Sequence, residues 1–264
     1  MNNQLNGYGR LFCPQTNIMQ FEGNWVEGAL QGEGQMYCQD TGKRLFDGIF
    51  KDGQLHNGTY YFPDETYVGD IRDNLMHGFG KSYDKHGKLI YEGHFANHMR
   101  EGFGKYYNEL GRLEYEGMHE QSVASGYGKQ YDYSTGSLVY EGNFKNGVPH
   151  GEAKMYCTGT GQVVFDGEWH EGSMKYGRYW WLETEDMYEG PFEDNLCHGI
   201  GKQYVKDKLW VEGTYVKGQL TGPANVFNLT SGEMTMKATF ENGKLVKATQ
   251  YSQDIGLYTG EFNE

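Results

Sequence analysis

Cysteine and histidine are the residues of this chain that could do metal chemistry, because zinc prefers thiolate and imidazole ligands. Cys197 and His198 are adjacent, but no CxxC or HxxxH partner accompanies them, so the sequence predicts no metal site. His77, His150 and His198 occupy one position of a repeated motif, in copies that are not neighbours. We therefore expect turn histidines rather than metal ligands or a catalytic base.

The remaining cysteines also share one repeat position. Each directly follows an aromatic residue, and these are Cys13, Cys38 and Cys157. In stacked hairpins, equivalent positions of neighbouring copies would lie two strand spacings apart, about 10 Å, which is beyond disulfide reach. We expect reduced cysteines in loops.

The glycine-rich pieces of the chain do not form catalytic or cofactor-binding motifs. The GYG, GEG and GFG pieces do not open a helix, as a nucleotide-binding loop must, and the chain has no GxSxG, P-loop or kinase signature. A catalytic site needs different residue types that converge at one place, whereas this sequence repeats the same types at even spacing. The sequence predicts no enzyme and no cofactor.

The composition and net charge of the chain argue against some classes of binding partner. The chain has 264 residues, a net charge of −13, 40 glycines, 22 tyrosines and 14 phenylalanines. The negative charge opposes binding to nucleic acid and to anionic lipid. No apolar stretch approaches membrane-spanning length, and the first ten residues lack the features of a signal peptide. We expect a cytoplasmic protein.

A short motif of an aromatic residue, a variable, often acidic residue and a glycine organises the chain. It recurs about every 21 to 25 residues, at 21–23, 46–48, 67–69, 91–93, 115–117, 140–142, 165–167, 188–190, 211–213 and 258–260, with Val211 in place of the aromatic residue in one copy. The last interval is 47 residues long and contains a degenerate copy in which Ala238 replaces the glycine. Each copy has two short arms that alternate large and small residues, joined by a polar turn such as Asn146-Gly147. The chain is predicted to be all-β, hairpin after hairpin.

Glycines inside strands mark close approach of another group. The Gly-x-Gly pairs of the second arms are therefore expected to clear one face, so that aromatic rings of adjacent arms lie across the bare backbone. The acids point to the opposite face and form a column, which is either a solvated face or a cation or ligand track: Glu22, Asp47, Glu92, Glu116, Glu141, Asp166, Glu189 and Glu212.

The units YEGNFKNGVPHGEAKMY, YEGHFANHMREGFGKYY and YEGPFEDNLCHGIGKQY resemble MORN repeats (membrane occupation and recognition nexus). The resemblance covers essentially all of residues 5–262. It implies an elongated, single-layer antiparallel sheet of about ten stacked β-hairpins. We expect one continuous array over residues 1–264, with half-repeats at both ends and degenerate copies after about residue 214, where Ala224 and Ala248 replace glycines.

Two copies depart in the same way from the regular spacing of the glycines. Their glycines are ten rather than nine residues apart, at 48–58 and 167–177, and a tyrosine, Tyr60 or Tyr179, stands where the second glycine is expected. This correlated change predicts a local bulge or bend. The surrounding aromatics either fill vacated space or anchor a protein partner, as Trp and Tyr do at interface hot spots. The candidate partner-binding residues are Tyr176, Tyr179, Trp180, Trp181, Tyr60 and Tyr61.

The ends of the array are further candidates, because an open arm leaves backbone groups unpaired. We expect contacts of another chain at Tyr8, Tyr258 and Phe262, from a complex partner or from a second copy in a homodimer.

The predicted function is that of a non-enzymatic protein-interaction scaffold or structural subunit of a larger assembly. Stand-alone arrays of the resembled family imply a cytoskeletal or axonemal setting, including the radial spokes of cilia and flagella. The alternative is a peripheral membrane adaptor that binds phosphoinositides, against which the acidic charge argues.

Overall fold

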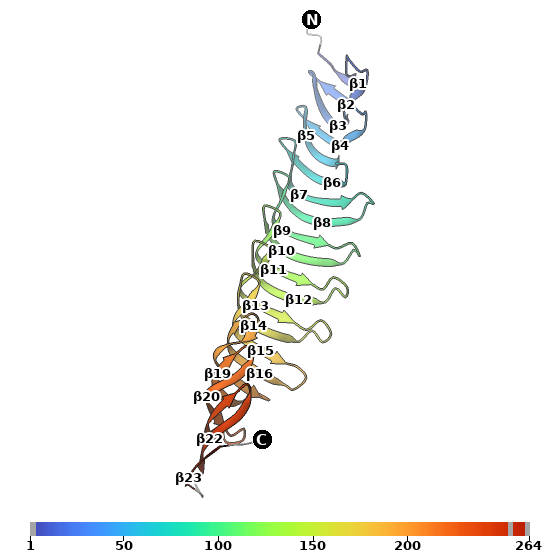
Figure 1. Cartoon of the computed structure of the whole chain (residues 1–264). Coiled ribbons are helices and arrows are strands. Elements are labelled where there is room, and N and C mark those ends of the chain that lie inside the picture. Colours follow the sequence, from blue (N-terminus) through green and yellow to red (C-terminus); the bar gives the residue numbers. More distant parts are fainter. Residues whose placement is uncertain (1–3, 253–255, 262–264) are drawn as a thin grey trace. The chain divides into compact units, whose positions relative to one another are not determined.

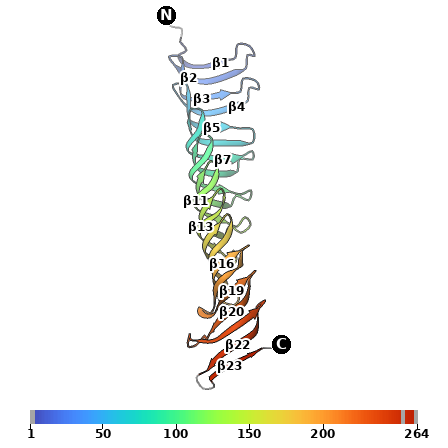
Figure 2. The same ribbon diagram turned by 60° about the vertical axis from the view of Figure 1, so that its left-hand side comes forward.

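The computed structural model describes residues 4–252 and 256–261 and falls into two compact units, residues 1–136 and 137–264. Every element of the described residues is a β-strand (Figure 1). Unit 1 consists of β1 Gly7–Phe12, β2 Met19–Val26, β3 Ala29–Tyr37, β4 Arg44–Lys51, β5 Gln54–Tyr61, β6 Glu65–Arg72, β7 Leu75–Asp84, β8 Leu89–Ala96, β9 Met99–Tyr107, β10 Leu113–Glu120 and β11 Val123–Tyr131. Each strand of unit 1 pairs antiparallel with the next (Figure 2).

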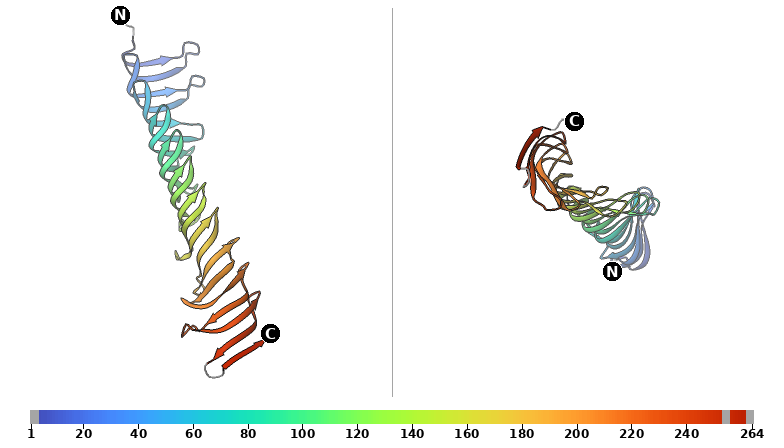
Figure 3. Two further views of the ribbon diagram at one scale, coloured as in Figure 1. Left: turned by 90° about the vertical axis from the view of Figure 1, so that its left-hand side faces the viewer. Right: turned by 90° about the horizontal axis from the view of Figure 1, so that it is seen from below.

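Unit 2 is built in the same way. It consists of β12 Leu138–Lys145, β13 Val148–Tyr156, β14 Val163–His170, β15 Ser173–Trp181, β16 Asp186–Glu193, β17 Leu196–Cys197, β18 Gly199–Val205, β19 Lys208–Val216, β20 Gln219–Phe227, β21 Met234–Glu241, β22 Lys244–Ser252 and β23 Gly256–Glu261. Consecutive strands can be followed by colour in Figure 3. Because β17 and β18 both pair with β16, they are two parts of one arm. The predicted all-β, antiparallel, hairpin fold is confirmed, with eleven pairs of arms where about ten were expected.

The hairpins close through two-residue turns in which both residues have positive φ. Asn146 and Gly147 have φ of 52° and 80°, and Asn97 and His98 have 51° and 68°. This is the type I′ turn, whose twist matches that of the flanking strands. The turn predicted at Asn146-Gly147 is confirmed.

In several hairpins the second turn residue also forms a hydrogen bond to the preceding repeat. The backbone N–H of Ser122 donates to the carbonyl of Arg100 at 2.9 Å, and the N–H of Arg100 donates to Oγ of Ser122 at 3.0 Å. His98 makes the same pair of contacts with Met76, at 3.1 and 3.3 Å. These reciprocal bonds fix the register between neighbouring repeats at their turns.

The Ser122 contact can be tested by substitution. We expect Ser122→Ala to lower the free energy of unfolding by about 1 kcal/mol, because the Arg100 N–H loses its acceptor while the strained φ of 68° remains. Ser122→Gly removes the same bond but relieves the strain, so its effect should be smaller. Urea unfolding of both variants measures the difference, and a larger loss for the glycine variant would contradict this reading.

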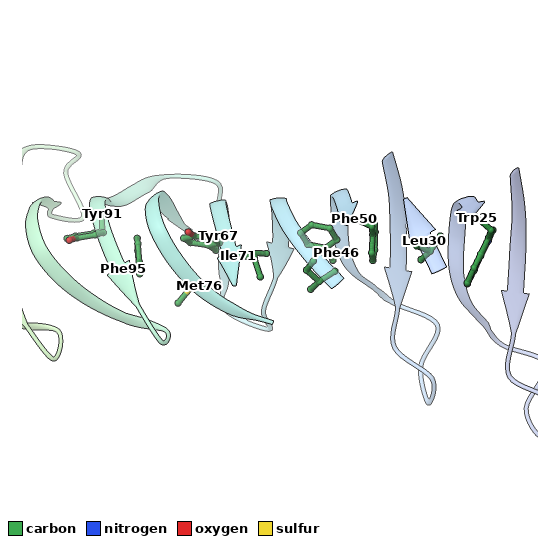
Figure 4. Packing of buried hydrophobic residues seen from close by; sticks show 10 residues of the cluster. Trp25, Leu30, Phe46, Phe50, Tyr67, Ile71, Met76, Tyr91 and Phe95 are labelled. Atoms are coloured by element: carbon green, nitrogen blue, oxygen red, sulfur yellow. The ribbon is translucent and has the colours of Figure 1, made fainter. Parts of the chain in front are cut away.

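Aromatic and aliphatic side chains from successive strands form a single buried row in unit 1, as Figure 4 shows. Phe46, Tyr67 and Tyr91 have no exposed surface. Neighbouring rings meet edge to face, with centroids 5.0 Å apart for Tyr67 and Phe95 and 5.1 Å for Tyr91 and Phe95. The row supplies the core of a sheet that is only one layer thick.

Four buried tyrosines, Tyr67, Tyr91, Tyr115 and Tyr188, lie over a pair of glycines on adjacent strands, whereas the copy that contains Tyr140 pairs Gly142 with Ala153. Gly93 of β8 pairs with Gly104 of β9, and a Cβ added at Gly104 would lie 2.6 Å from Cε2 of Tyr91 and closer still to its hydroxyl. Tyr188 covers Gly190 and Gly201 in unit 2 in the same way. The prediction that rings lie across bare backbone is therefore confirmed, and a side chain at Gly104 would overlap the Tyr91 ring.

The two glycines of a Gly-x-Gly pair have different structural roles. This corrects our expectation that both leave the same face free of side chains. Gly104 lies under the ring with ordinary extended backbone, whereas Gly102 has φ of 67° and sits in the register shift between β8 and β9. The first glycine is needed for its left-handed backbone, not for space. Nothing but Cβ of His94, at 3.8 Å, would meet a side chain there.

The two irregular copies lack this first glycine. Gly58 pairs directly with Gly48, and Gly177 with Gly167, so the second glycine is present and is not replaced by Tyr60 or Tyr179, as the sequence had suggested. Both copies have a smaller register shift between their arms, and the connections that follow, β5–β6 and β15–β16, have none. The local change of geometry is therefore the loss of one bulge residue, and not the added bulge or bend that the sequence predicted.

The C-terminal copies exchange ring and glycine together. Val211 replaces the tyrosine, and Ala224, Ala238 and Ala248 replace glycines in successive strands. These four side chains are all buried. The smaller Val211 leaves room for a methyl group, so the hairpin pairing continues without the ring.

Candidate protein-binding face

The face opposite the buried rings carries acids and bases in alternation. We call these residues the charged ladder: Lys81, Glu92, Lys105, Glu116 and Lys129 in unit 1, and Glu141, Lys154, Asp166, Arg178, Glu189, Lys202 and Glu212 in unit 2. Within each unit, each residue lies directly opposite the next on the adjacent strand. Lys81 Nζ lies 3.1 Å from Glu92 Oε2, and Arg178 Nε lies 3.4 Å from Glu189 Oε2. The predicted acidic column exists, but bases between the acids make it neither a bare acidic face nor a cation track.

Tyrosine hydroxyls complete the ladder. Oη of Tyr107 donates a hydrogen bond to Oε1 of Glu92 at 2.9 Å, and Oη of Tyr131 donates one to Oε1 of Glu116 at 2.8 Å. The hydrogen bond from Tyr107, followed by the contact with Lys81, lowers the pKa of the Glu92 carboxyl. The ionised form of this glutamate is therefore favoured by the fold.

This linkage predicts a pH-dependent cost for Tyr107→Phe. Because the pKa of Glu92 is lowered in the folded state, its contribution to stability is present above the pKa of the unfolded chain and is lost as the pH falls. The variant should be less stable than the wild type at pH 7, and the gap should shrink at pH 3. Urea unfolding at both pH values tests this, with Tyr106→Phe, on the opposite face, as control; an equal gap at both pH values would refute the linkage.

A row of large apolar side chains stands beside the ladder in unit 1. We call Phe79, Phe103, Met118 and Tyr127 the apolar row; their exposed fractions are 51%, 52%, 42% and 53%. Phe103 pairs directly with Met118 across β9 and β10, and Phe79 packs edge to face on His94 at 5.9 Å. Each aromatic of the row is the middle residue of a Gly-x-Gly motif. The core rings lie on the other face, so the row does no core packing.

Unit 2 has a shorter patch at equivalent positions. Tyr176 of β15 is 51% exposed and pairs with Pro191 of β16, and Ile200 of β18 is 72% exposed. Other equivalent positions in unit 2 are polar, such as Glu152 and Glu168, which pair with each other across β13 and β14. Large apolar side chains therefore occupy these positions only in particular repeats.

The predicted aromatic cluster of unit 2 is divided by the alternation of strand β15. Tyr179 and Trp181 share one face, where their rings are 5.5 Å apart, while Tyr176 and Trp180 belong to the other. Tyr179, Trp180 and Trp181 line an open groove of about 870 Å³ together with Tyr215 and Cys157. Tyr176 belongs with the exposed apolar positions described above, and partner binding by the cluster stays a prediction.

The other predicted contact residues lie apart from the apolar row. Tyr60 stacks on Phe62 at 4.6 Å and packs against the buried row of unit 1, and Tyr61 is only partly exposed. Tyr8 is 69% exposed and donates to Glu22 at 2.6 Å. The side chain of Tyr258 and the whole of Phe262 lie outside the described residues.

Metal-ligand types do not gather in the described part of the chain. No group of three or more His, Cys, Asp or Glu side chains there could hold a metal ion. The four cysteines are free, and burial raises the pKa of the Cys197 thiol to about 11. Hydrogen bonding with a threonine three residues on, followed by backbone N–H groups, lowers the pKa of the thiols of Cys13, Cys38 and Cys157.

Stacked hairpins with rings over pairs of glycines define a β-hairpin repeat protein. Six segments match the family model described as MORN repeat: residues 21–43, 46–66, 67–87, 91–108, 140–161 and 188–207. The chain therefore contains MORN repeats, which indicate a protein-interaction or membrane-binding role. No curated protein matches the sequence. Among the described residues, no helix is long and apolar enough to cross a membrane.

The structure extends the repeat beyond the matched segments. Hairpin β10–β11 lies outside them, yet Tyr115 covers Gly117 and Gly128 as Tyr91 covers Gly93 and Gly104. The apolar row was missed in the sequence although it had a signal there. Only some Gly-x-Gly motifs have an aromatic middle residue, and the structure needs none at that position.

Proposed function

We propose that the chain is a non-enzymatic protein-interaction scaffold whose apolar row is the docking surface. The observation that carries the proposal is that Phe79, Phe103 and Tyr127 are each about half exposed on a face without a core. Half-exposed aromatic side chains contribute less to folding than buried ones, whereas aromatic residues dominate the energetics of protein interfaces.

The pattern of charge favours a protein over a membrane as the partner. Apolar side chains such as Val26 and Met99 are exposed beside the hairpin turns, where they could touch a lipid surface. The neighbouring turn positions, however, include Glu27, Asp52 and Asp73. Carboxylates at the tips repel anionic headgroups, so these edges are poor lipid contacts.

Affinity capture with variant proteins tests the proposal. The triple variant Phe79→Ser/Phe103→Ser/Tyr127→Ser should lose partners that the wild type retains, while Val26→Ser, an exposed apolar residue outside the row, should retain them. Crosslinking should place those partners on β7–β11. If the triple variant and the wild type recover the same proteins, the row is not the docking surface.

Vesicle flotation addresses the alternative of a membrane adaptor. We expect the chain to stay with the unbound fraction when mixed with vesicles containing phosphoinositides. Flotation that is abolished by salt would support lipid binding instead, because electrostatic attraction to headgroups is screened.

The larger assembly is proposed to be cytoskeletal or axonemal, in the cytoplasm or in a cilium or flagellum. The support is the resemblance of the repeats alone. Co-sedimentation with detergent-extracted cytoskeletons is the expected result, and complete extraction with the soluble fraction would contradict it.

A further inference from the structure

We infer that the segment docking on the apolar row is an amphipathic α-helix that crosses strands β7–β11, with apolar side chains seven residues apart and basic side chains along one flank. The inference rests on the proposed function, since it names the occupant of the same surface.

The spacing of the row matches a helix. Phe79, Phe103 and Tyr127 lie on β7, β9 and β11, with one strand between each pair. Strands are about 4.8 Å apart, so equivalent side chains recur every 10 Å or so. Seven residues of α-helix rise about 10.5 Å. One side chain per heptad would therefore meet each aromatic of the row in turn.

An extended partner fits the row less well. Side chains on one face of a strand recur about every 6.7 Å, and three extended residues, which span about 10 Å, place successive contacts on opposite faces. From the first to the last aromatic, the row spans four strand spacings, about 19 Å, or about 13 helical residues. Two heptads are enough to cover it.

The width of the row also favours a helix over a second sheet. The row is one side chain wide, and Lys81, Glu92, Lys105, Glu116 and Lys129 of the charged ladder run along one side of it. A sheet packed face to face would bury this ladder, at the desolvation cost of several charges. A helix about 10 Å in diameter covers the row and leaves the charges at the rim.

The other side of the row, toward the hairpin turns, is acidic. Glu120 shares the face of Met118, and its Oε2 accepts a hydrogen bond from Ser125 Oγ at 3.2 Å. Glu101 Oε2 accepts one from the backbone N–H of Gln121 at 3.1 Å. Both carboxylates are held beside the row, so lysine or arginine on one flank of the helix complements them. A second copy of this chain would bring like charges together instead.

A synthetic peptide tests the inference against the full chain. The probe is a 21-residue helical peptide with leucine at one position of every heptad and lysine along one flank, labelled for fluorescence anisotropy. A second peptide has the same composition with leucine every five residues. We expect the heptad peptide to bind at least about tenfold more tightly than the second, and Phe103→Ser to weaken it at least about tenfold.

Val26→Ser is the matched control and should leave the affinity for the heptad peptide unchanged. Circular dichroism and melting of each variant show that the fold is intact. Equal binding of the two peptides, unchanged binding by a folded Phe103→Ser variant, or the absence of binding would overturn the helix. If affinity capture still loses partners with the triple variant, the scaffold function stands and only the helical occupant is wrong.

Discussion

Replacing Gly104 by valine is expected to lower the free energy of unfolding by about 3 kcal/mol. Valine favours β-strands, and the backbone of Gly104 is extended, so neither strand propensity nor φ opposes the change. The cost arises because a Cβ at this position would overlap the Tyr91 ring, which is fully buried between Phe95 and His119. The ring has no free space to enter. Urea unfolding monitored by circular dichroism measures the loss.

Gly9→Val is the matched control. Gly9 occupies the same repeat position in β1, where it pairs with Gly23. A Cβ at Gly9 would meet nothing closer than Cδ1 of Trp25, at 3.7 Å. This variant should stay within about 0.5 kcal/mol of the wild type. Equal losses at Gly9 and Gly104 would show that strand glycines matter here for a reason other than the ring.

A double variant separates the ring contact from other effects. In the C-terminal copies, Val211 and Ala224 stand where Tyr91 and Gly104 stand in unit 1. Gly104→Ala should therefore cost less in a Tyr91→Val background than in the wild type. Additive losses in this cycle would mean that ring and glycine do not interact.

Tyr188→Ala is expected to destabilise unit 2 by about 3 to 5 kcal/mol. Tyr188 is fully buried, and its ring lies 4.9 Å from that of Tyr215 and 5.3 Å from that of Phe192. Its hydroxyl lies 3.0 Å from the carbonyl oxygen of His198. Alanine leaves a cavity and removes the donor to that carbonyl, so packing and hydrogen bonding are lost together.

Tyr176→Ala provides the comparison within the same unit. Tyr176 is 51% exposed and lies outside the core, so its loss should change the free energy of unfolding by less than about 0.5 kcal/mol. Thermal melting of the two variants side by side is sufficient. A large loss for Tyr176→Ala would assign it a structural role and remove it from the exposed apolar positions.

The fold could be predicted because its rules are local and repeated. Asn146-Gly147 specifies a type I′ turn, and alternation of large and small residues specifies the arms. The separate roles of Gly102 and Gly104 could not be predicted. The two glycines look alike in the sequence and differ only in φ, which depends on the register shift against β8.

The candidate site was harder to predict because it depends on pairing across strands. Lys105 lies opposite Glu92 on one side and Glu116 on the other, and this alternation of charge appears only once the register is known. The cluster of aromatic residues led us to predict Trp180 and Trp181 as partner contacts, but these sequence neighbours belong to opposite faces of the strand. Phe103 was not predicted as a contact residue, because it is of the same residue type as the core aromatics and differs from them only in the face that it occupies.

The most direct test compares Phe103 with its neighbour Gly104, because we expect Phe103 to bind a partner and Gly104 to stabilise the fold. The measurement is the free energy of urea unfolding of Phe103→Ser and Gly104→Val. The prediction is that Phe103→Ser stays within about 0.5 kcal/mol of the wild type while Gly104→Val loses about 3 kcal/mol. A destabilised Phe103→Ser, or a Gly104→Val as stable as the wild type, would contradict it.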